Sequence, residues 1–293
     1  MMVIDFHTHS FPDHIAGKAI RKLSNASHSV PFTDGTESGL RRSMEEAGID
    51  FSVVLPVATS PDQVAHINDR AFAMNEHTDG SGLISFGSMH PDCPYWKEEL
   101  TRLKDHGVKG IKLHPVYQGK DLDDPSYLRI LDCCAMLGLV VVTHSGYDIG
   151  FPRVSHSSPQ MALNAVKAIG RGTGNYCLIL AHMGGWKNWD DTEALAMEMV
   201  ESGPVMIDTS FSIGSFMPLD DGYWKEEETR MLDRDAALRI LHAFGMERVV
   251  FGTDSPWSEQ KETLRIVKSL IEDPGDLEQV LSKNAERLLD LCR

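Results

Sequence analysis

The sequence has no uninterrupted apolar run of the ~20 residues that a transmembrane helix needs, so we expect no membrane span. It also has little positive charge, because 28 Lys and Arg stand against 43 Asp and Glu, for a net charge of −15. Proteins that bind nucleic acid or anionic membranes gain affinity from positive charge, which makes both poor partners for this chain. We expect a small-molecule substrate instead.

The cysteine spacing and the opening residues bear on the compartment in which we expect the protein. The five cysteines form no CxxC pair, which favours a reducing compartment over a disulfide scaffold. The opening residues, MMVIDFHTHS, lack the basic and apolar regions of a secretory signal. Together these features predict a cytoplasmic protein.

Short β-branched apolar runs alternate with longer stretches of helical spacing along the whole chain. We expect strands at 3–9, 51–57, 82–89, 108–114, 139–144, 178–182, 205–209 and 249–254. We expect helices at 36–47, 62–77, 95–105, 126–137, 159–169, 191–201, 234–243, 258–271 and 284–291. Strands too apolar to have a solvent-exposed face indicate a parallel sheet that is covered by helices.

Eight such βα units predict an α/β fold, a single (β/α)₈ TIM barrel over residues 1–293. A doubly wound sheet is less favoured, because no Gly-rich phosphate loop follows the first strand. Two connections are long, 10–35 after the first strand and 210–232 after the seventh. Long connections at the active face of a barrel usually contact substrate.

Six of the thirteen histidines fall at or just after the carboxyl ends of predicted strands. In a barrel these ends meet at one face, where catalytic groups lie. A lone strand-end histidine is more often a hydrogen-bonded structural residue, but a whole set at one mouth favours a shared function. The six are His7, His9, His90, His114, His144 and His182.

Side chains alternate along a strand, so Asp5, His7 and His9 should face the barrel mouth while Ile4 and Phe6 face the helices. The same rule places three further sets inward: Val140, Val142 and His144; Leu178, Leu180 and His182; and Val250, Gly252 and Asp254. Imidazole and carboxylate groups suit zinc, iron or manganese, and three or four protein ligands leave a position open for water. The sequence therefore predicts a catalytic divalent metal site.

Four motifs in this order resemble the amidohydrolase superfamily, in particular its amidohydrolase-2 branch: DFHTH at 5–9, THSG at 143–146, AHMGG at 181–185 and GTDSPW at 252–257. The resemblance implies that His7, His9, His144 and Asp254 surround the metal. It also implies that His182 is a further ligand or polarises substrate or water. We therefore expect Asp254 and His182 to act in catalysis.

The resembled branch contains both hydrolases and non-oxidative decarboxylases. Our first prediction is a hydrolase that attacks a small carboxylated or cyclic amide, ester or lactone with metal-activated water, with Asp254 taking the proton. The alternative is a decarboxylase of an aromatic or unsaturated acid, in which His182 or His114 would donate a proton. A non-catalytic metal- or ligand-binding barrel is a third reading, although no expected ligand is missing.

Lys112 and His114, in GIKLHP, should enter the mouth together from the fourth strand. The resemblance implies that a lysine here is carbamylated in binuclear members, but we favour a free ammonium that binds a substrate carboxylate. A structural ion pair with Asp5 or Asp208 is the plain alternative. These two residues are thus candidates for substrate binding or a second metal.

Weaker candidates lie in the loops that follow the strands. Arg153 and His156 are placed to bind a substrate anion, and Trp257, with Trp186, Trp189 and Trp224, to enclose an apolar substrate. Surface charge and loop packing explain the same residues equally well. We expect one or two divalent ions, zinc first with manganese or iron as alternatives. A monomer and a homodimer both remain open.

Overall fold

The structure of the protein, a computed structural model, describes residues 1–214 and 216–291. Residue 215 of the predicted long connection and residues 292 and 293 of the predicted domain lie outside this description. The strands are β1 (Ile4–Thr8), β2 (Phe51–Val54), β3 (Leu83–Ser85), β4 (Gly87–Ser88), β5 (Gly110–Leu113), β6 (Val140–Thr143), β7 (Leu178–Leu180), β8 (Val205–Asp208) and β9 (Val249–Val250). Only Phe86 separates β3 from β4, so they are two parts of the strand predicted at 82–89.

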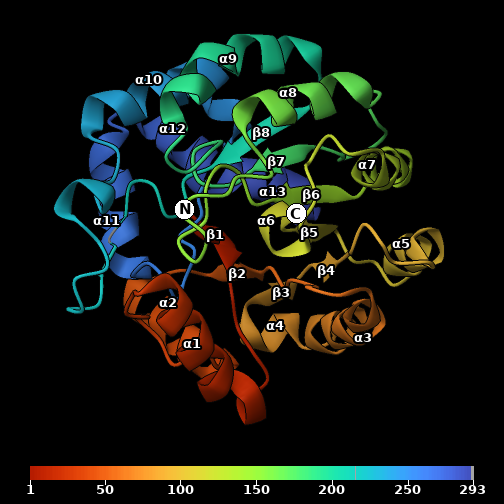
Figure 1. The fold of residues 1–293 in the computed structure, drawn as a ribbon, viewed down its shortest axis with the longest axis horizontal. Coiled ribbons are helices and arrows are strands. Elements are labelled where there is room, and N and C mark those ends of the chain that lie inside the picture. Colours follow the sequence, from red (N-terminus) through yellow and green to blue (C-terminus); the bar gives the residue numbers. More distant parts are fainter. Residues whose placement is uncertain (215, 292–293) are drawn as a thin grey trace.

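All strand pairs are parallel, in the orders β1-β2-β3 and β4-β5-β6-β7-β8-β9. Backbone hydrogen bonds close the ring between β1 and the segment after β9. The N–H of Phe6 donates to the carbonyl of Phe251 at 2.7 Å, and the N–H of His9 to that of Ser255 at 2.7 Å. The predicted (β/α)₈ barrel is thereby confirmed, with its helices arranged around the strands (Figure 1).

Nine helices match the predicted ones: α2 (Glu37–Ala47), α3 (Val64–Asn75), α5 (Trp96–Asp105), α7 (Pro125–Leu137), α8 (Pro159–Ala168), α9 (Trp189–Ser202), α10 (Arg234–Phe244), α11 (Gln260–Leu270) and α13 (Asn284–Leu289). The prediction missed α1 (Asp13–Ser27), α4 (Thr78–Ser81), α6 (Pro115–Gln118) and α12 (Pro274–Glu278). Of these, α1 fills much of the connection expected at 10–35. Across the described residues, no helix combines the length and apolar character needed to cross a membrane.

Two apolar layers hold the barrel together. The larger lies between the strands and the helices, and the smaller fills the lower part of the barrel interior. In the interior, side chains of α13 close the floor, and α13 lies near the centre of the ring in Figure 1. The interior cluster includes Ile4, Phe6, Val53, Val140, Val142, Ile179, Val250, Leu288 and Leu289.

The alternation predicted for β1 is wrong at its start. Ile4 and Phe6 point into the barrel interior, whereas Asp5 points out and accepts a hydrogen bond from Gln260 of α11 at 2.7 Å. The pairing with β2 is irregular between Asp5 and Thr8. This irregularity turns His7 back into the mouth, because an extra residue in a strand reverses the facing of the residues after it.

The alternation predicted for β7 is also wrong. Ile179 lies in the interior, whereas Leu178 and Leu180 pack against the helices. His182 still reaches the mouth, because it and Met183 adopt left-handed backbone conformations with φ of 62° and 55°. The conformation of the loop after β7, rather than the alternation of side chains along the strand, therefore positions His182.

Candidate metal centre

One cavity of about 950 Å³ opens at the carboxyl ends of the strands. Its wall near the strand ends contains seven of the residues singled out in the sequence: His7, His9, Lys112, His114, His144, His182 and Asp254. They come from five strands or the turns after them, so the barrel brings together residues up to 247 positions apart, from His7 to Asp254. Trp257 also lines this cavity.

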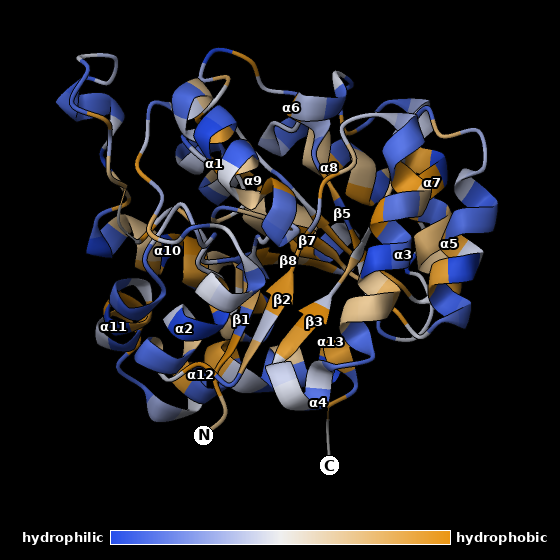
Figure 2. Ribbon diagram, turned by 90° about the horizontal axis from the view of Figure 1, so that it is seen from below, coloured by the Kyte–Doolittle hydropathy of each residue, from blue (hydrophilic) through white to orange (hydrophobic). Residues whose placement is uncertain are grey.

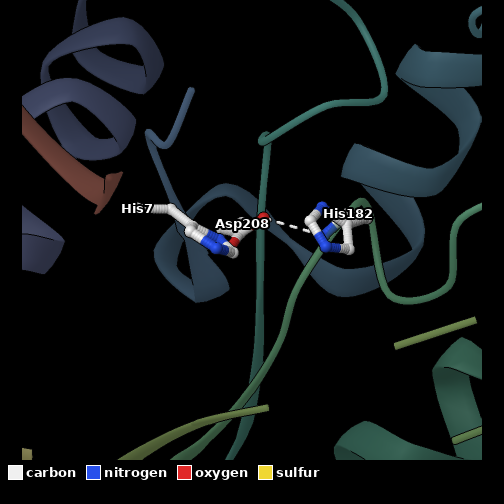
Figure 3. A group of neighbouring side chains, drawn as sticks. All are labelled: His7, His182 and Asp208. Carbon is white, nitrogen blue, oxygen red and sulfur yellow. Dashed lines mark hydrogen bonds and ion pairs between the residues drawn. The ribbon is translucent and has the colours of Figure 1, made fainter. Parts of the chain in front are cut away.

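His7 is held from behind by Asp208, at the end of β8. Its Nδ1 lies 2.7 Å from Oδ2 of Asp208, and the other carboxylate oxygen accepts a bond from the backbone N–H of His182 at 2.8 Å. Figure 3 shows Asp208 between the two histidines. A carboxylate at this distance accepts a hydrogen bond from Nδ1–H of His7, so the lone pair lies on Nε2 and faces the cavity.

The side chains of His9 and Asp254 are in contact with each other at the cavity wall. His9 Nδ1 lies 2.8 Å from the carbonyl oxygen of Leu55, which can only accept, so the ring proton belongs on Nδ1. The lone pair of Nε2 then points at Oδ1 of Asp254, 2.9 Å away. Two acceptors at this separation require a proton or a cation between them.

The same arrangement is repeated between His144 and His182. His144 Nε2 lies 3.0 Å from the carbonyl of Tyr147, and His182 Nδ1 lies 2.9 Å from the hydroxyl of Ser210, which itself donates to Asp208. Both protons therefore point outward. Their remaining nitrogens, Nδ1 of His144 and Nε2 of His182, face each other at 3.0 Å.

Nε2 of His7 and of His9 thus lie 3.4 and 2.9 Å from the carboxylate of Asp254, and the free nitrogens of His144 and His182 face each other next to them. The potential metal ligands within 4.8 Å of one another form three groups: His7, His9 and Asp254; His7, His182 and Asp208; and His114, His144 and Asp148. Burial lowers the pKa of His7, His144 and His182 well below the usual value, which favours the neutral form that binds metals. Outward hydrogen bonds that fix each ring are typical of metal-binding histidines. The donor set fits a divalent metal ion.

Lys112 lies at the base of this centre and is 1% exposed. Its Nζ is 3.2 Å from Nε2 of His7, and burial lowers its pKa to about 8 although Asp208 and Asp254 raise it in part. Within residues 1–214 and 216–291 it forms no ion pair with a carboxylate, so the ion pair with Asp5 or Asp208 is not found. An ammonium buried without an ion-pair partner is a natural place for a substrate anion.

His114 extends the site away from the four imidazoles. It stacks on His144 with ring centroids 4.2 Å apart and on Tyr117 at 3.9 Å. Its Nδ1 accepts a long bond from the N–H of Tyr117, so its proton sits on Nε2, 3.5 Å from Asp148. Burial raises the pKa of Asp148, a residue that the sequence patterns did not single out.

The carboxyl of Asp254 is also buried, which raises its pKa, while the neighbouring ring of His9 acts in the opposite direction. Its backbone is left-handed, with φ of 68°, and its N–H donates to the carbonyl of His7 at 2.8 Å. A non-glycine residue in the left-handed region of backbone space is strained, so its neighbours must stabilise this conformation. Here the bond to β1 holds Asp254 toward the centre.

Several sequence candidates are not brought to the centre. Arg153 is exposed and does not line the cavity, and His156 bonds to Asp121 on the surface. Trp189 and Trp224 donate hydrogen bonds to the carbonyls of His182 and Ser27, which supports loop packing for them. Trp186 does line the cavity.

The sequence patterns missed three polar residues of the centre: Asp148, Asp208 as a support for His7, and Ser210. Asp208 carries a usable signal, because it lies at the carboxyl end of the predicted strand 205–209, as the histidines do in theirs. Asp148 and Ser210 come after strands, in loops whose paths have no periodic signal.

A closed barrel with a buried set of histidines and one carboxylate at its mouth defines a metal-binding α/β barrel. The chain matches the family described as amidohydrolase over residues 4–291, so it belongs to that family, as its motifs predicted. None of the curated proteins compared with it matches.

Solved structures share the fold at low sequence identity. A 2,6-dihydroxybenzoate decarboxylase from Rhizobium is 14% identical, with a TM-score of 0.69 and 99% of both chains covered. A dihydroxybenzoic acid decarboxylase from Polaromonas, solved with manganese, is 13% identical, with a TM-score of 0.69 over 100% of this chain and 98% of that one. An uncharacterised TIM-barrel protein from Bordetella bronchiseptica is 15% identical, with a TM-score of 0.73 and 99% of both chains covered.

Proposed function

We propose that the protein is a metal-dependent decarboxylase of an aromatic or unsaturated acid. This is the reaction that the sequence placed second, after hydrolysis. The observation that carries it is Lys112, a buried ammonium beside the imidazoles that has no carboxylate partner among the described residues. Burying an unpaired ammonium costs free energy, so an acid substrate would complete the site.

Decarboxylation needs a held carboxylate and a proton for the carbon that loses it. The C–C bond breaks, its electron pair stays on the carbon, and a proton is added there as CO₂ leaves. Lys112 would hold the carboxylate. His114 would supply the proton from its Nε2–H and regain one from the carboxyl of Asp148, which lies 3.5 Å away and whose pKa is raised by burial, whereas Nε2 of His182 is turned to His144.

The metal would be held by His7, His9, His144 and Asp254, with His182 beside it. When bound, it would orient the acid and stabilise negative charge that develops during the reaction. The nitrogen-rich donor set suits zinc or iron, whereas the Polaromonas decarboxylase was solved with manganese. Manganese and zinc should therefore both be tested for restoring activity to metal-free protein.

Neighbouring decarboxylases of known structure support this proposal through their shared fold and nearly complete coverage. Hydrolysis remains the second candidate, because Asp254 lies 2.9 Å from His9 Nε2, where it would accept a proton from activated water. The two reactions differ in the source of the atoms that enter the product.

The deciding experiment screens aromatic acids, unsaturated acids, amides and lactones, and runs any reactive compound in water enriched in heavy oxygen. Decarboxylation should release one CO₂ per substrate consumed and add no oxygen label to the organic product. One label in the product without CO₂ would overturn the proposal in favour of hydrolysis. Product incubated without enzyme corrects for exchange.

A substitution at Lys112 tests the role of the ammonium. Lys112→Met should raise KM for the acid by roughly 10- to 100-fold, the value of a hydrogen bond to a charged group. Metal content should stay the same, because Lys112 is not among the proposed ligands. An unchanged KM would show that the carboxylate is held elsewhere.

A further inference from the structure

The cavity that contains the metal centre continues well beyond it. From His9 it passes Leu55 and Pro56 at the end of β2 and reaches Val54, which belongs to the outer apolar layer rather than to the barrel interior. Its total of about 950 Å³ lies near the upper end of the ~300–1,000 Å³ typical of ligand pockets. A single-ring acid held at Lys112 would leave this extension, the side arm, unfilled.

The side arm lies beside β2, and no helix of the part of the chain that the structure describes packs closely on the outside of this strand. α2 packs on α11, and α3 packs on β3 and β4. Figure 2, seen from this side, shows β2 in view between α2 and α3. α1 provides the remaining wall, and the apolar side chains that line the arm are Ala19, Leu23 and Ala26 of α1 and Ile67, Ala71 and Met74 of α3.

Three titratable side chains, Lys22, His66 and Arg70, also line this part of the cavity. Arg70 forms an ion pair with Glu37, and Lys22 and His66 are exposed to solvent. Ile15 of α1, by contrast, lines the cavity while 41% exposed. Apolar surface left open next to a binding site indicates a ligand that covers it.

We propose that the side arm binds a hydrocarbon tail of the substrate, whose acid group is held at Lys112. The inference rests on the proposed function for the acid end and adds the tail. The substrate class is then an aromatic or unsaturated acid that carries an extended apolar chain. Each methylene buried in the arm should strengthen binding roughly fourfold.

The test measures binding of benzoate, 4-butylbenzoate and 4-octylbenzoate to metal-loaded protein by titration calorimetry, below the concentrations at which they aggregate. We expect Kd to fall by at least 100-fold from benzoate to 4-octylbenzoate. Equal affinity for all three would overturn the proposal. So would tighter binding of a benzoate whose tail of equal length ends in a carboxylate.

Substitutions locate the effect in the side arm. Ala19→Phe, on the half-buried lining face of α1, should weaken binding of 4-octylbenzoate at least 10-fold and leave benzoate unchanged. Ala26→Phe, at an exposed lining position, should act in the same direction and does not disturb the core. Asn25→Phe adds the same side chain on an exposed part of α1 outside the cavity and should bind like the wild type.

If Asn25→Phe weakened binding of 4-octylbenzoate as much as Ala19→Phe does, the tail would not be bound in the side arm. Because binding is measured without turnover, the two proposals can fail separately. A gain with tail length but no CO₂ from any acid would refute only the decarboxylase. CO₂ release without a gain would refute only the tail.

Discussion

The floor and the mouth of the barrel are built from the same strands and are equally buried, yet they differ in what burial achieves. At the floor, Phe6 and Val142 are 0% exposed in an apolar cluster. At the mouth, His7 and Lys112 are each 1% exposed, but imidazole lone pairs and an ammonium face one another. Burial of apolar side chains stabilises the fold by itself. The buried polar groups at the mouth need a bound metal or substrate as their partner.

The floor and the mouth therefore contribute differently to stability and to function. The floor needs nothing from outside the chain. The mouth holds acceptors 2.9 and 3.0 Å apart, at His9 with Asp254 and at His144 with His182, which a cation would bridge. Changes at the floor should lower stability, and changes at the mouth should lower function.

The largest effect is expected from removing two ligands at the mouth. His7→Ala combined with His9→Ala should abolish tight metal binding and lower activity at least ~10³-fold, because a metal contributes several kcal/mol to the transition state. Elemental analysis and turnover measure this. Unchanged metal content in the double variant would refute the ligand assignment.

A substitution at the floor should show the reverse pattern. Phe6→Ala removes a fully buried ring that contacts Phe86 edge to face, with ring centroids 5.6 Å apart. The free energy of unfolding should fall by about 3–5 kcal/mol, measured by urea denaturation. Folded Phe6→Ala protein should keep its metal. Loss of the metal would contradict the prediction that the floor contributes to stability and the mouth to function.

Asp254→Asn separates catalysis from metal binding within the mouth. It should cost at least ~100-fold in rate, the lower end for a proton-transfer group, because an amide cannot exchange the proton. The imidazoles should still hold the metal, at reduced affinity. Near-normal turnover of metal-loaded Asp254→Asn protein would rule out the proton-transfer role.

The effect expected to change activity least concerns Asp5, which is buried outside the barrel wall between the two regions. Burial raises its pKa to about 7, although Gln260, Thr253 and the N–H of His7 donate to it and lower the pKa. Because the native state then keeps a proton that the unfolded state loses, stability falls as the pH rises from about 4 to about 7. The loss is at most about 1.4 kcal/mol per pH unit and levels off above pH 7.

Asp5→Asn should remove this pH dependence. The measurement compares the free energy of unfolding of wild type and variant at pH 5, 6 and 7, so that groups common to both cancel. The difference between the two proteins should change with pH in favour of the variant. A constant difference would show that Asp5 stays ionised, held by its four donated hydrogen bonds.

Much of the centre was predictable because strand ends are local features. His7, His9, Lys112, His114, His144, His182 and Asp254 all lie at or near ends of runs that the sequence shows, and the structure places them around one cavity. Their roles remain predictions. Arg153 is exposed and does not line that cavity, and its role too stays a prediction, because a loop without periodicity gives no information about its direction.

The sequence by itself determined the repeated βα units, and with them the closed barrel and the meeting of polar strand ends at one mouth. That information is local, since hydrophobic periodicity records which face of each element is buried. Only the tertiary structure decided the irregularity in β1 that turns Asp5 out, the left-handed turn that carries His182 in, and the support of His7 by Asp208. It also decided that α2 and α3 leave the wall of β2 open, because the angle at which a helix packs depends on distant neighbours.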